Sequence, residues 1–199
     1  MSTLEPRQAL ELLYEGNRRF VAGETIEPRR NSARLQEIAT VQTPFAAFLG
    51  CADSRVPIEI VFDQGFGDLF VNRIAGNVAT SETIGSLEFG TGVLGAKVLY
   101  VLGHTACGAV TATMKRQPVP GQISSLFQHI RPAVKVAGGD LEAAVRENVR
   151  IQAETLAEAS PVIAELVEQG RLIVAGGVYD LGTGRVTPVE IALDRRQIR

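Results

Sequence analysis

The sequence of 199 residues contains no tryptophan, only two cysteines and two histidines, and a formal net charge of only −2. No run of lysine or arginine is longer than two residues, so the charge pattern does not indicate a nucleic-acid-binding surface. No stretch approaches the roughly 18–20 apolar residues that a membrane-spanning helix needs. The chain is therefore not expected to act on nucleic acid or within a membrane.

The first residues also lack the apolar segment of a secretory signal peptide, so we expect a cytoplasmic protein. Cysteines in that compartment are usually reduced, which leaves both free for metal binding or catalysis. Hydrophobic residues make up 45% and charged residues 21%, as in ordinary globular proteins. Because the length fits one substantial core and no repeat is visible, we expect a single domain over residues 1–199.

Short apolar segments alternate with amphipathic ones along the chain, which predicts an α/β fold. We expect a mainly parallel central sheet, with about four parallel strands and a C-terminal antiparallel strand, flanked by helices. The predicted strands are 45–50, 68–73, 97–102, 171–175 and 185–192. The predicted helices are 6–21, 32–40, 57–62, 81–94 with Ser81 as its cap, 107–115, 122–136, 140–159 and 161–169.

Two segments with chemically reactive side chains follow predicted strands. The first, Cys51-Ala52-Asp53-Ser54-Arg55, comes directly after strand 45–50, and the second, residues 103–108, comes after strand 97–102. His104 and Cys107 are spaced so that both can reach one metal ion from a single turn, and Cys51 supplies a third ligand from another strand. Two thiolates and one imidazole are a typical zinc set, and three protein ligands leave the open position of a catalytic site. Strands 45–50 and 97–102 would then be neighbours at a topological switch point.

Three other interpretations of these residues stay open. Cys51 and Cys107 can be ordinary buried cysteines, which behave as small hydrophobic residues. They can also form a redox pair, or Asp53 can be a permanent fourth ligand that closes a structural zinc site. Beside an open metal site, Asp53 would instead serve the metal-bound water, while Arg55 keeps that carboxylate ionised and aimed.

At these residues the sequence resembles the β-class carbonic anhydrases. Residues 51–55 match that family's Cys-x-Asp-x-Arg signature, and residues 103–108 match its His-x-x-Cys signature. The resemblance extends from the N-terminal helix through 68–73 and 75–77 to 176–179. It implies Zn²⁺ held by Cys51, His104 and Cys107, with Asp53 and Arg55 as the catalytic pair. The implied reaction is reversible hydration of carbon dioxide to bicarbonate and a proton, by attack of zinc-bound hydroxide that Asp53 orients.

The resemblance also implies substrate contacts and partners. Gln42 matches a glutamine that donates a hydrogen bond to substrate, Phe70 and Phe89 match an apolar pocket wall, and Gly108 lies beside the ligand Cys107. Members of the family form homodimers or homotetramers whose subunits complete one another's pockets. We therefore expect residues 1–40 to form an N-terminal helical arm that packs on a partner subunit.

One subgroup of the family binds a second, inhibitory bicarbonate through a tryptophan, an arginine and a tyrosine. Arg73 and Tyr179 match two of these residues, but Phe48 stands at the place of the tryptophan and offers no N–H donor. We therefore expect no such regulatory site and a structural role for Arg73 and Tyr179. His129 is expected to be a surface or packing residue rather than a proton shuttle.

Two alternative functions use the same residues. The first is a hydrolase of carbon disulfide or carbonyl sulfide, which would need the same zinc ligands. The second is a catalytically silent interaction module that zinc stabilises. Whether Asp53 closes the resting site, and whether the oligomer is a dimer or a tetramer, do not follow from the sequence.

Overall fold

The structure is a computed structural model that describes residues 4–193. The first three residues of the expected N-terminal arm and the last six of the expected domain lie outside this part. Five strands form one sheet in the order β2-β1-β3-β4-β5. The first four are parallel and β5 is antiparallel to β4, so the predicted fold class is confirmed. The strands are β1 (Ala46–Gly50), β2 (Leu69–Arg73), β3 (Val98–His104), β4 (Ile173–Tyr179) and β5 (Val186–Val189).

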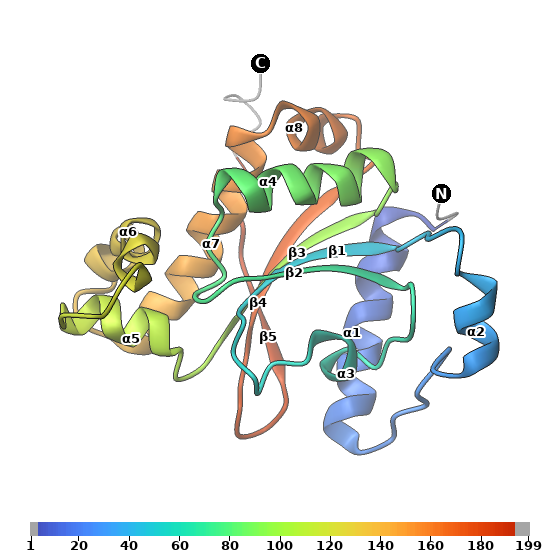
Figure 1. Cartoon of the computed structure of the whole chain (residues 1–199), viewed down its shortest axis with the longest axis horizontal. Coiled ribbons are helices and arrows are strands. Elements are labelled where there is room, and N and C mark those ends of the chain that lie inside the picture. Colours follow the sequence, from blue (N-terminus) through green and yellow to red (C-terminus); the bar gives the residue numbers. More distant parts are fainter. Residues whose placement is uncertain (1–3, 194–199) are drawn as a thin grey trace.

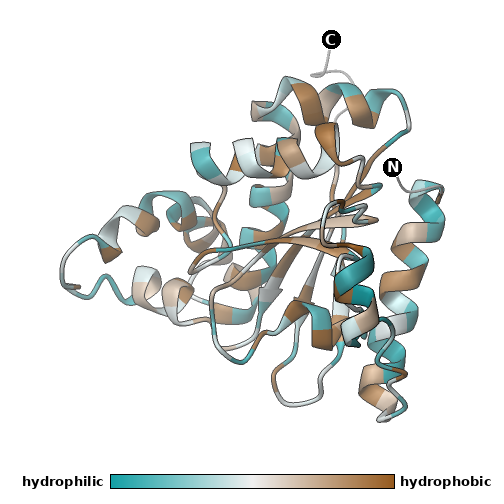
Figure 2. Ribbon diagram, turned by 45° about the vertical axis from the view of Figure 1, so that its right-hand side comes forward, coloured by the Kyte–Doolittle hydropathy of each residue, from teal (hydrophilic) through white to brown (hydrophobic). Residues whose placement is uncertain are grey.

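Helices cover both faces of the sheet, which gives three layers (Figure 1). Alternate residues of β1 and β3 point to opposite faces, as the two-residue period of a strand requires. Phe48 and Tyr100 pack toward α1 (Pro6–Ala22) and α3 (Ile58–Val61). Leu49 and Val101 pack toward α4 (Ser81–Glu88), α7 (Leu141–Ala159) and α8 (Pro161–Glu168). The outer helices in Figure 2 carry both hydrophilic and hydrophobic bands, as helices that cover a sheet on one side do.

The remaining helices lie at the ends of the sheet. They are α2 (Ser32–Glu37), a π-helical turn η1 (Phe89–Val93), α5 (Gly108–Lys115), a 3-10 turn η2 (Ile123–Leu126) and α6 (Phe127–Ala137). The buried sides of α5, α6 and α7 form a separate hydrophobic cluster with both cysteines, at the carboxyl end of β1 and β3. None of the helices in residues 4–193 is both long and apolar enough to cross a lipid bilayer.

The structure corrects two local expectations. Thr80, not Ser81, caps α4, because its hydroxyl accepts the N–H of Thr83. Strand β4 also runs on to Tyr179 instead of ending near residue 175. Its glycines do not break the strand; they allow close packing, since a Cβ at Gly177 would lie 2.3 Å from the Tyr100 hydroxyl.

The N-terminal helix α1 packs on the chain's own sheet. Ala9 and Leu13 are fully buried in the core beneath it, and Gly16 approaches the backbone of Phe62. Asn17 is also buried, and its amide donates to the carbonyls of Val61 and Gly184. The inner face of α1 is thus occupied by its own domain, and contact of the outer face with a partner stays a prediction.

Candidate metal centre

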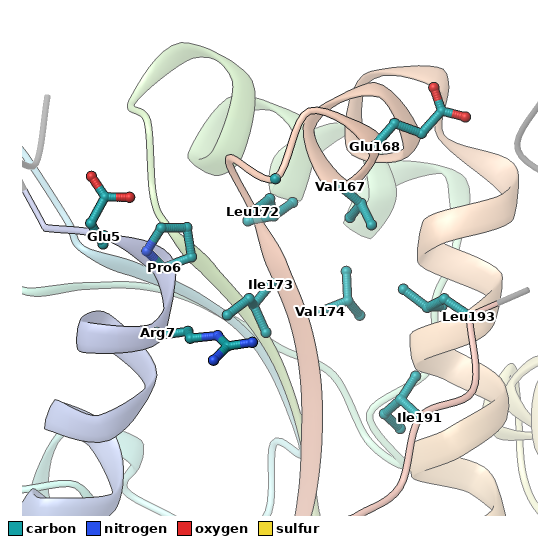
Figure 3. Close-up of a pocket in the computed structure, with 11 residues that line it drawn as sticks. Glu5, Pro6, Arg7, Val167, Glu168, Leu172, Ile173, Val174, Ile191 and Leu193 are labelled. Carbon is teal, nitrogen blue, oxygen red and sulfur yellow. The ribbon is translucent and has the colours of Figure 1, made fainter. Parts of the chain in front are cut away.

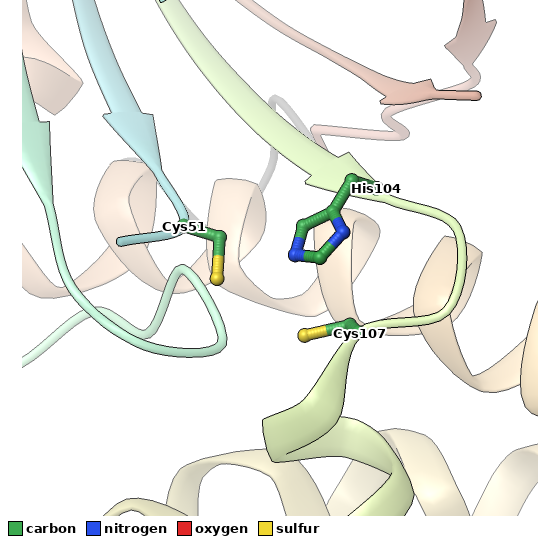
Figure 4. A group of neighbouring side chains, drawn as sticks. All are labelled: Cys51, His104 and Cys107. Carbon is green, nitrogen blue, oxygen red and sulfur yellow. The ribbon is translucent and has the colours of Figure 1, made fainter. Parts of the chain in front are cut away.

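The two predicted motifs meet at the carboxyl edge of the sheet. Cys51 follows the last residue of β1, and His104 is the last residue of β3, the strand that pairs with β1. Cys107 precedes the first residue of α5, after a turn in which Ala106 has a φ of 54°. The two sulfur atoms and an imidazole nitrogen lie within 4.8 Å of one another, and all three residues are buried (Figure 4). The strand adjacency predicted from the sequence is confirmed.

His104 is oriented as a metal ligand. Its Nδ1 lies 2.9 Å from the carbonyl oxygen of Thr105, which can only accept, so Nδ1 carries the proton. Its Nε2 is buried and has no hydrogen-bond partner among the described residues. A buried nitrogen lone pair without a partner is costly unless a ligand such as a metal occupies it. Backbone bonds of this kind fix the tautomer of metal-binding histidines.

The pKa values of the two thiols are shifted in opposite directions. The hydrogen bond from Cys107 lowers the pKa of the Cys51 thiol, and the Gly76 N–H adds to this, although burial opposes it. The pKa of Cys107 is raised because its thiol is the donor in that bond and is buried. The lowered pKa favours the thiolate form at Cys51, and thiolate is the form that binds zinc.

Asp53 and Arg55 form a two-pronged ion pair beside the three ligands. The Arg55 Nε and Nη2 atoms donate to separate carboxylate oxygens of Asp53 at 2.9 and 2.8 Å, and the Arg55 backbone N–H donates at 3.0 Å. These bonds from Arg55 hold the pKa of Asp53 well below its usual range. The Asp53 Oδ2 atom also lies 3.8 Å from Nε2 of His104. An ionised carboxylate thus lies beside the position that a metal would take.

Arg73 supports the backbone of the same segment. Its guanidinium donates to the carbonyl oxygens of Cys51 at 2.9 Å and Asp53 at 2.6 Å. Both of these contacts are to main-chain atoms, so they agree with the structural role expected for Arg73. The sequence alone gave no indication of which atoms it would hold.

The expected substrate residues lie elsewhere in the chain, except for Gly108, which follows Cys107. Phe70 pairs with Ala47 near the amino end of β1. Ala47 precedes Cys51 by four residues, which corresponds to about 13 Å along an extended strand. Phe89 stacks on Phe70, with ring centroids 6.2 Å apart, and Gln42 is exposed before β1 begins. Within one chain the structure does not bring these three side chains to the metal ligands.

A cavity of about 730 Å³ lies at the amino end of β4, between α1 and α8 (Figure 3). Leu172, Ile173, Val174 and Ile191 form part of its mainly aliphatic lining, and none of the three ligand residues lines it. Its position at the opposite end of the strands separates it from the chemistry at Cys51 and His104.

The fold and the donors define an α/β protein with a Cys₂His group that could hold a metal ion at the carboxyl edge of its sheet. The family model for "Carbonic anhydrase" matches residues 46–186. "Carbonic anhydrase 2" of Mycobacterium tuberculosis is 37% identical over 193 residues, which covers 93% of each chain. "Carbonic anhydrase" of Mycolicibacterium smegmatis is 35% identical over 194 residues and covers 94% of each.

Solved structures agree with these matches. The β-carbonic anhydrase of Coccomyxa, solved with acetazolamide, superposes with a TM-score of 0.72 at 28% identity, over 90% of this chain and 86% of that one. A structure from a study of two tetrameric β-carbonic anhydrases of Sordaria macrospora shares the fold, with a TM-score of 0.71 at 20% identity and coverage of 92% and 97%. The chain belongs to the carbonic anhydrase family, in its β class.

Proposed function

We propose that this chain is a zinc-dependent enzyme that reversibly hydrates carbon dioxide to bicarbonate and a proton. The observation that carries this proposal is the buried group of Cys51, His104 and Cys107 beside an Asp53 carboxylate held by Arg55. Membership of the carbonic anhydrase family supports the same reaction. It also favours carbon dioxide over carbon disulfide or carbonyl sulfide as substrate, and an enzyme over a silent module.

The donor set fits Zn²⁺. Two sulfur ligands and an unpartnered imidazole nitrogen lie close enough together for one ion to contact all three. Cys51, His104 and Cys107 would hold the ion, and the Asp53 carboxylate lies beside them, 3.8 Å from Nε2 of His104. When bound, zinc is a Lewis acid that lowers the pKa of water to about 7 in well-characterised enzymes.

Asp53 orients the attacking oxygen. Its carboxylate is ionised at neutral pH because Arg55 donates to both of its oxygens, so it can only accept hydrogen bonds. An O–H group that donates to Asp53 directs its lone pair away from the carboxylate and toward carbon dioxide. Arg55 does not touch the substrate in this scheme; it is a positioning residue for Asp53.

The same ion pair favours an open resting site. For Asp53 to become a fourth metal ligand, it would have to give up at least part of its two-pronged contact with Arg55. The segment is further fixed by the Arg73 contact to the Asp53 carbonyl. We therefore propose that solvent, not Asp53, completes the site at neutral pH.

A second copy of the chain supplies the remaining pocket residues in this proposal. Gln42 precedes β1, and Phe70 and Phe89 lie together near its amino end, whereas Cys51 follows its carboxyl end, so the three are not expected to reach carbon dioxide at Cys51 of their own chain. Phe70 lies on β2, the strand at one edge of the sheet, and Phe89 is 47% exposed, so both are available to a partner. A homodimer or homotetramer, with the arm of residues 1–40 contributing its outer face, is the expected assembly. The cytoplasmic location expected from the absence of a signal-peptide segment stays a prediction.

Stopped-flow hydration of carbon dioxide, with the zinc content of each sample measured, tests this function. Wild type should contain zinc and hydrate carbon dioxide, and it should turn over carbonyl sulfide and carbon disulfide poorly or not at all. Cys51→Ser should lose zinc and activity together, whereas Asp53→Asn should keep zinc and lose activity. Asp140→Asn is the matched control, since Asp140 caps α7 through local bonds that asparagine also makes. A zinc-loaded wild-type protein that hydrates nothing, or an active Asp53→Asn variant, would overturn the assignment.

A further inference from the structure

The segment between β2 and α4 provides a direct contact to the metal ligand Cys51. The backbone N–H of Gly76 donates to the Cys51 sulfur at a distance of 3.3 Å. Gly76 has a φ of 77°, and a Cβ there would lie 2.7 Å from Ile130 and 3.2 Å from Ala109. The positive φ and these close contacts with side chains of α5 and α6 favour glycine at the position that places the N–H at the sulfur.

Two buried amide side chains on α7 hold this segment in place. Asn148 is 1% exposed, and its Nδ2 donates to the Gly76 carbonyl at 2.9 Å. Gln152, one turn further along and 2% exposed, accepts the N–H of Ala79 at 2.8 Å. Gln152 also donates to Asn148 at 3.2 Å and to the carbonyl of His129 at 3.0 Å. The two amides therefore bind both ends of residues 76–79 and join them to α6 and α7.

We infer that Asn148, supported by Gln152, is a positioning residue that fixes the Gly76 N–H against the Cys51 sulfur and so sets the affinity of the metal site. The inference rests on the proposed zinc site. Within residues 4–193, Asn148 makes no hydrogen bond to Cys51, His104 or Cys107. It acts through one glycine residue, whose carbonyl it holds and whose N–H contacts Cys51.

The chemistry of the contacts explains why amides are needed. The Gly76 carbonyl is buried, and without Asn148 it would lose its bond from this side chain. An apolar residue at 148 would fill the space, but it could not fix the orientation of residue 76. The N–H···S bond would then compete with other arrangements of the segment, and the sulfur would lose a donor that stabilises its thiolate form.

The inference is tested by measuring the zinc affinity of the variant Asn148→Leu in competition with a chromophoric chelator. Loss of such an outer contact typically weakens metal binding by about 10- to 100-fold, and we expect a loss in this range. The matched control is Asn17→Leu in α1. Asn17 is also a buried helical amide with bonds to backbone carbonyls at 2.9 and 3.1 Å, but those bonds hold Val61 and Gly184. Asn17→Leu should lower thermal stability and leave zinc affinity unchanged.

A second variant and a spectroscopic readout cover the case in which Asn148→Leu does not fold. Asn148→Ser is smaller and polar, and its hydroxyl is too short to replace the bond to Gly76, so it should also weaken zinc binding. In Co²⁺-substituted protein, the sulfur-to-cobalt charge-transfer band should change in the Asn148 variants and not in Asn17→Leu.

Each outcome has one meaning. Wild-type zinc affinity and an unchanged cobalt band in a folded Asn148 variant would show that Asn148 has only a structural role, which would overturn the inference. A wild-type protein that binds no zinc would instead overturn the proposed function. A loss of affinity in both the Asn148 and the Asn17 variants would also overturn the inference, because general destabilisation would then explain it.

Discussion

Replacement of Arg73 by methionine separates a structural role from anion binding. Arg73 ends β2, in register with Gly50, and donates to the carbonyls of Cys51 and Asp53. The net contribution of one hydrogen bond to the free energy of unfolding is about 0.5–1.5 kcal/mol. The Arg73 side chain is exposed, which favours the lower half of that range. Loss of both bonds should therefore reduce the free energy of unfolding by about 1–2 kcal/mol.

For a chain of this length, about 1 kcal/mol corresponds to a Tm change of about 2–4 °C, so Arg73→Met should lower Tm by about 2–8 °C. Hydration of carbon dioxide should fall in the same variant, because the segment that carries both Cys51 and Asp53 loses its support. Arg146→Met, at an exposed arginine of α7, should change neither quantity and serves as the control.

Thermal denaturation and stopped-flow assays across a series of bicarbonate concentrations give the measurement. If Arg73 has the structural role expected here, its variant and the wild type respond to bicarbonate in the same way. An unchanged Tm together with relief of bicarbonate inhibition would refute this reasoning and would make Arg73 an anion-binding residue despite Phe48 and the absence of tryptophan.

Three further predictions concern stability. Gly16→Ala should lower the free energy of unfolding in urea by about 1–3 kcal/mol, because its Cβ would lie 1.8 Å from the Phe62 carbonyl oxygen. Gly85→Ala, where a Cβ meets nothing within 4 Å, should not lower it, and equal losses in the two variants would contradict the packing of α1. Burial alone would raise the pKa of Asp63, but hydrogen bonds from Arg19 and from backbone N–H groups lower it below the ordinary value. Asp63 therefore stabilises the fold above about pH 4, and this stabilisation is lost as the pH falls below that value. The difference in Tm between wild type and Asp63→Asn should thus become smaller at acidic pH. A difference that does not change with pH would disprove this role of Asp63. Removal of zinc by a chelator should lower Tm reversibly, and an unchanged Tm would argue against zinc in the folded site.

The fold class could be predicted from the sequence because alternation of apolar segments is a local property. All five strands and the major helices fall within a few residues of the ranges expected from periodicity and caps. The error in the length of β4 occurred where distant contacts override local preference. Gly176 and Gly177 look like a strand ending, but in β4 they leave room for the side chains of Val149 on α7 and Tyr100 on β3.

The meeting of Cys51, His104 and Cys107 could also be predicted, since Cys51 and the His104–Cys107 turn both follow strands and parallel strands bring their carboxyl ends to one edge. The surroundings of those ligands could not. Asn148 lies 72 positions from Gly76, and nothing in its local sequence distinguishes it from a polar residue on an exposed helix face.

The sequence by itself determined the elements of this protein, the residue types of its metal site and the carboxylate–guanidinium pair at Asp53 and Arg55. Each depends on neighbours within one segment, or on the rule that parallel strands end together. Tertiary structure alone decided that Arg73 holds the ligand segment, that Gly76 donates to Cys51, and that Gln42, Phe70 and Phe89 lie away from the metal ligands of their own chain. These features depend on how α7 and β2 pack in space, and packing between distant segments leaves no periodic signal in a single sequence.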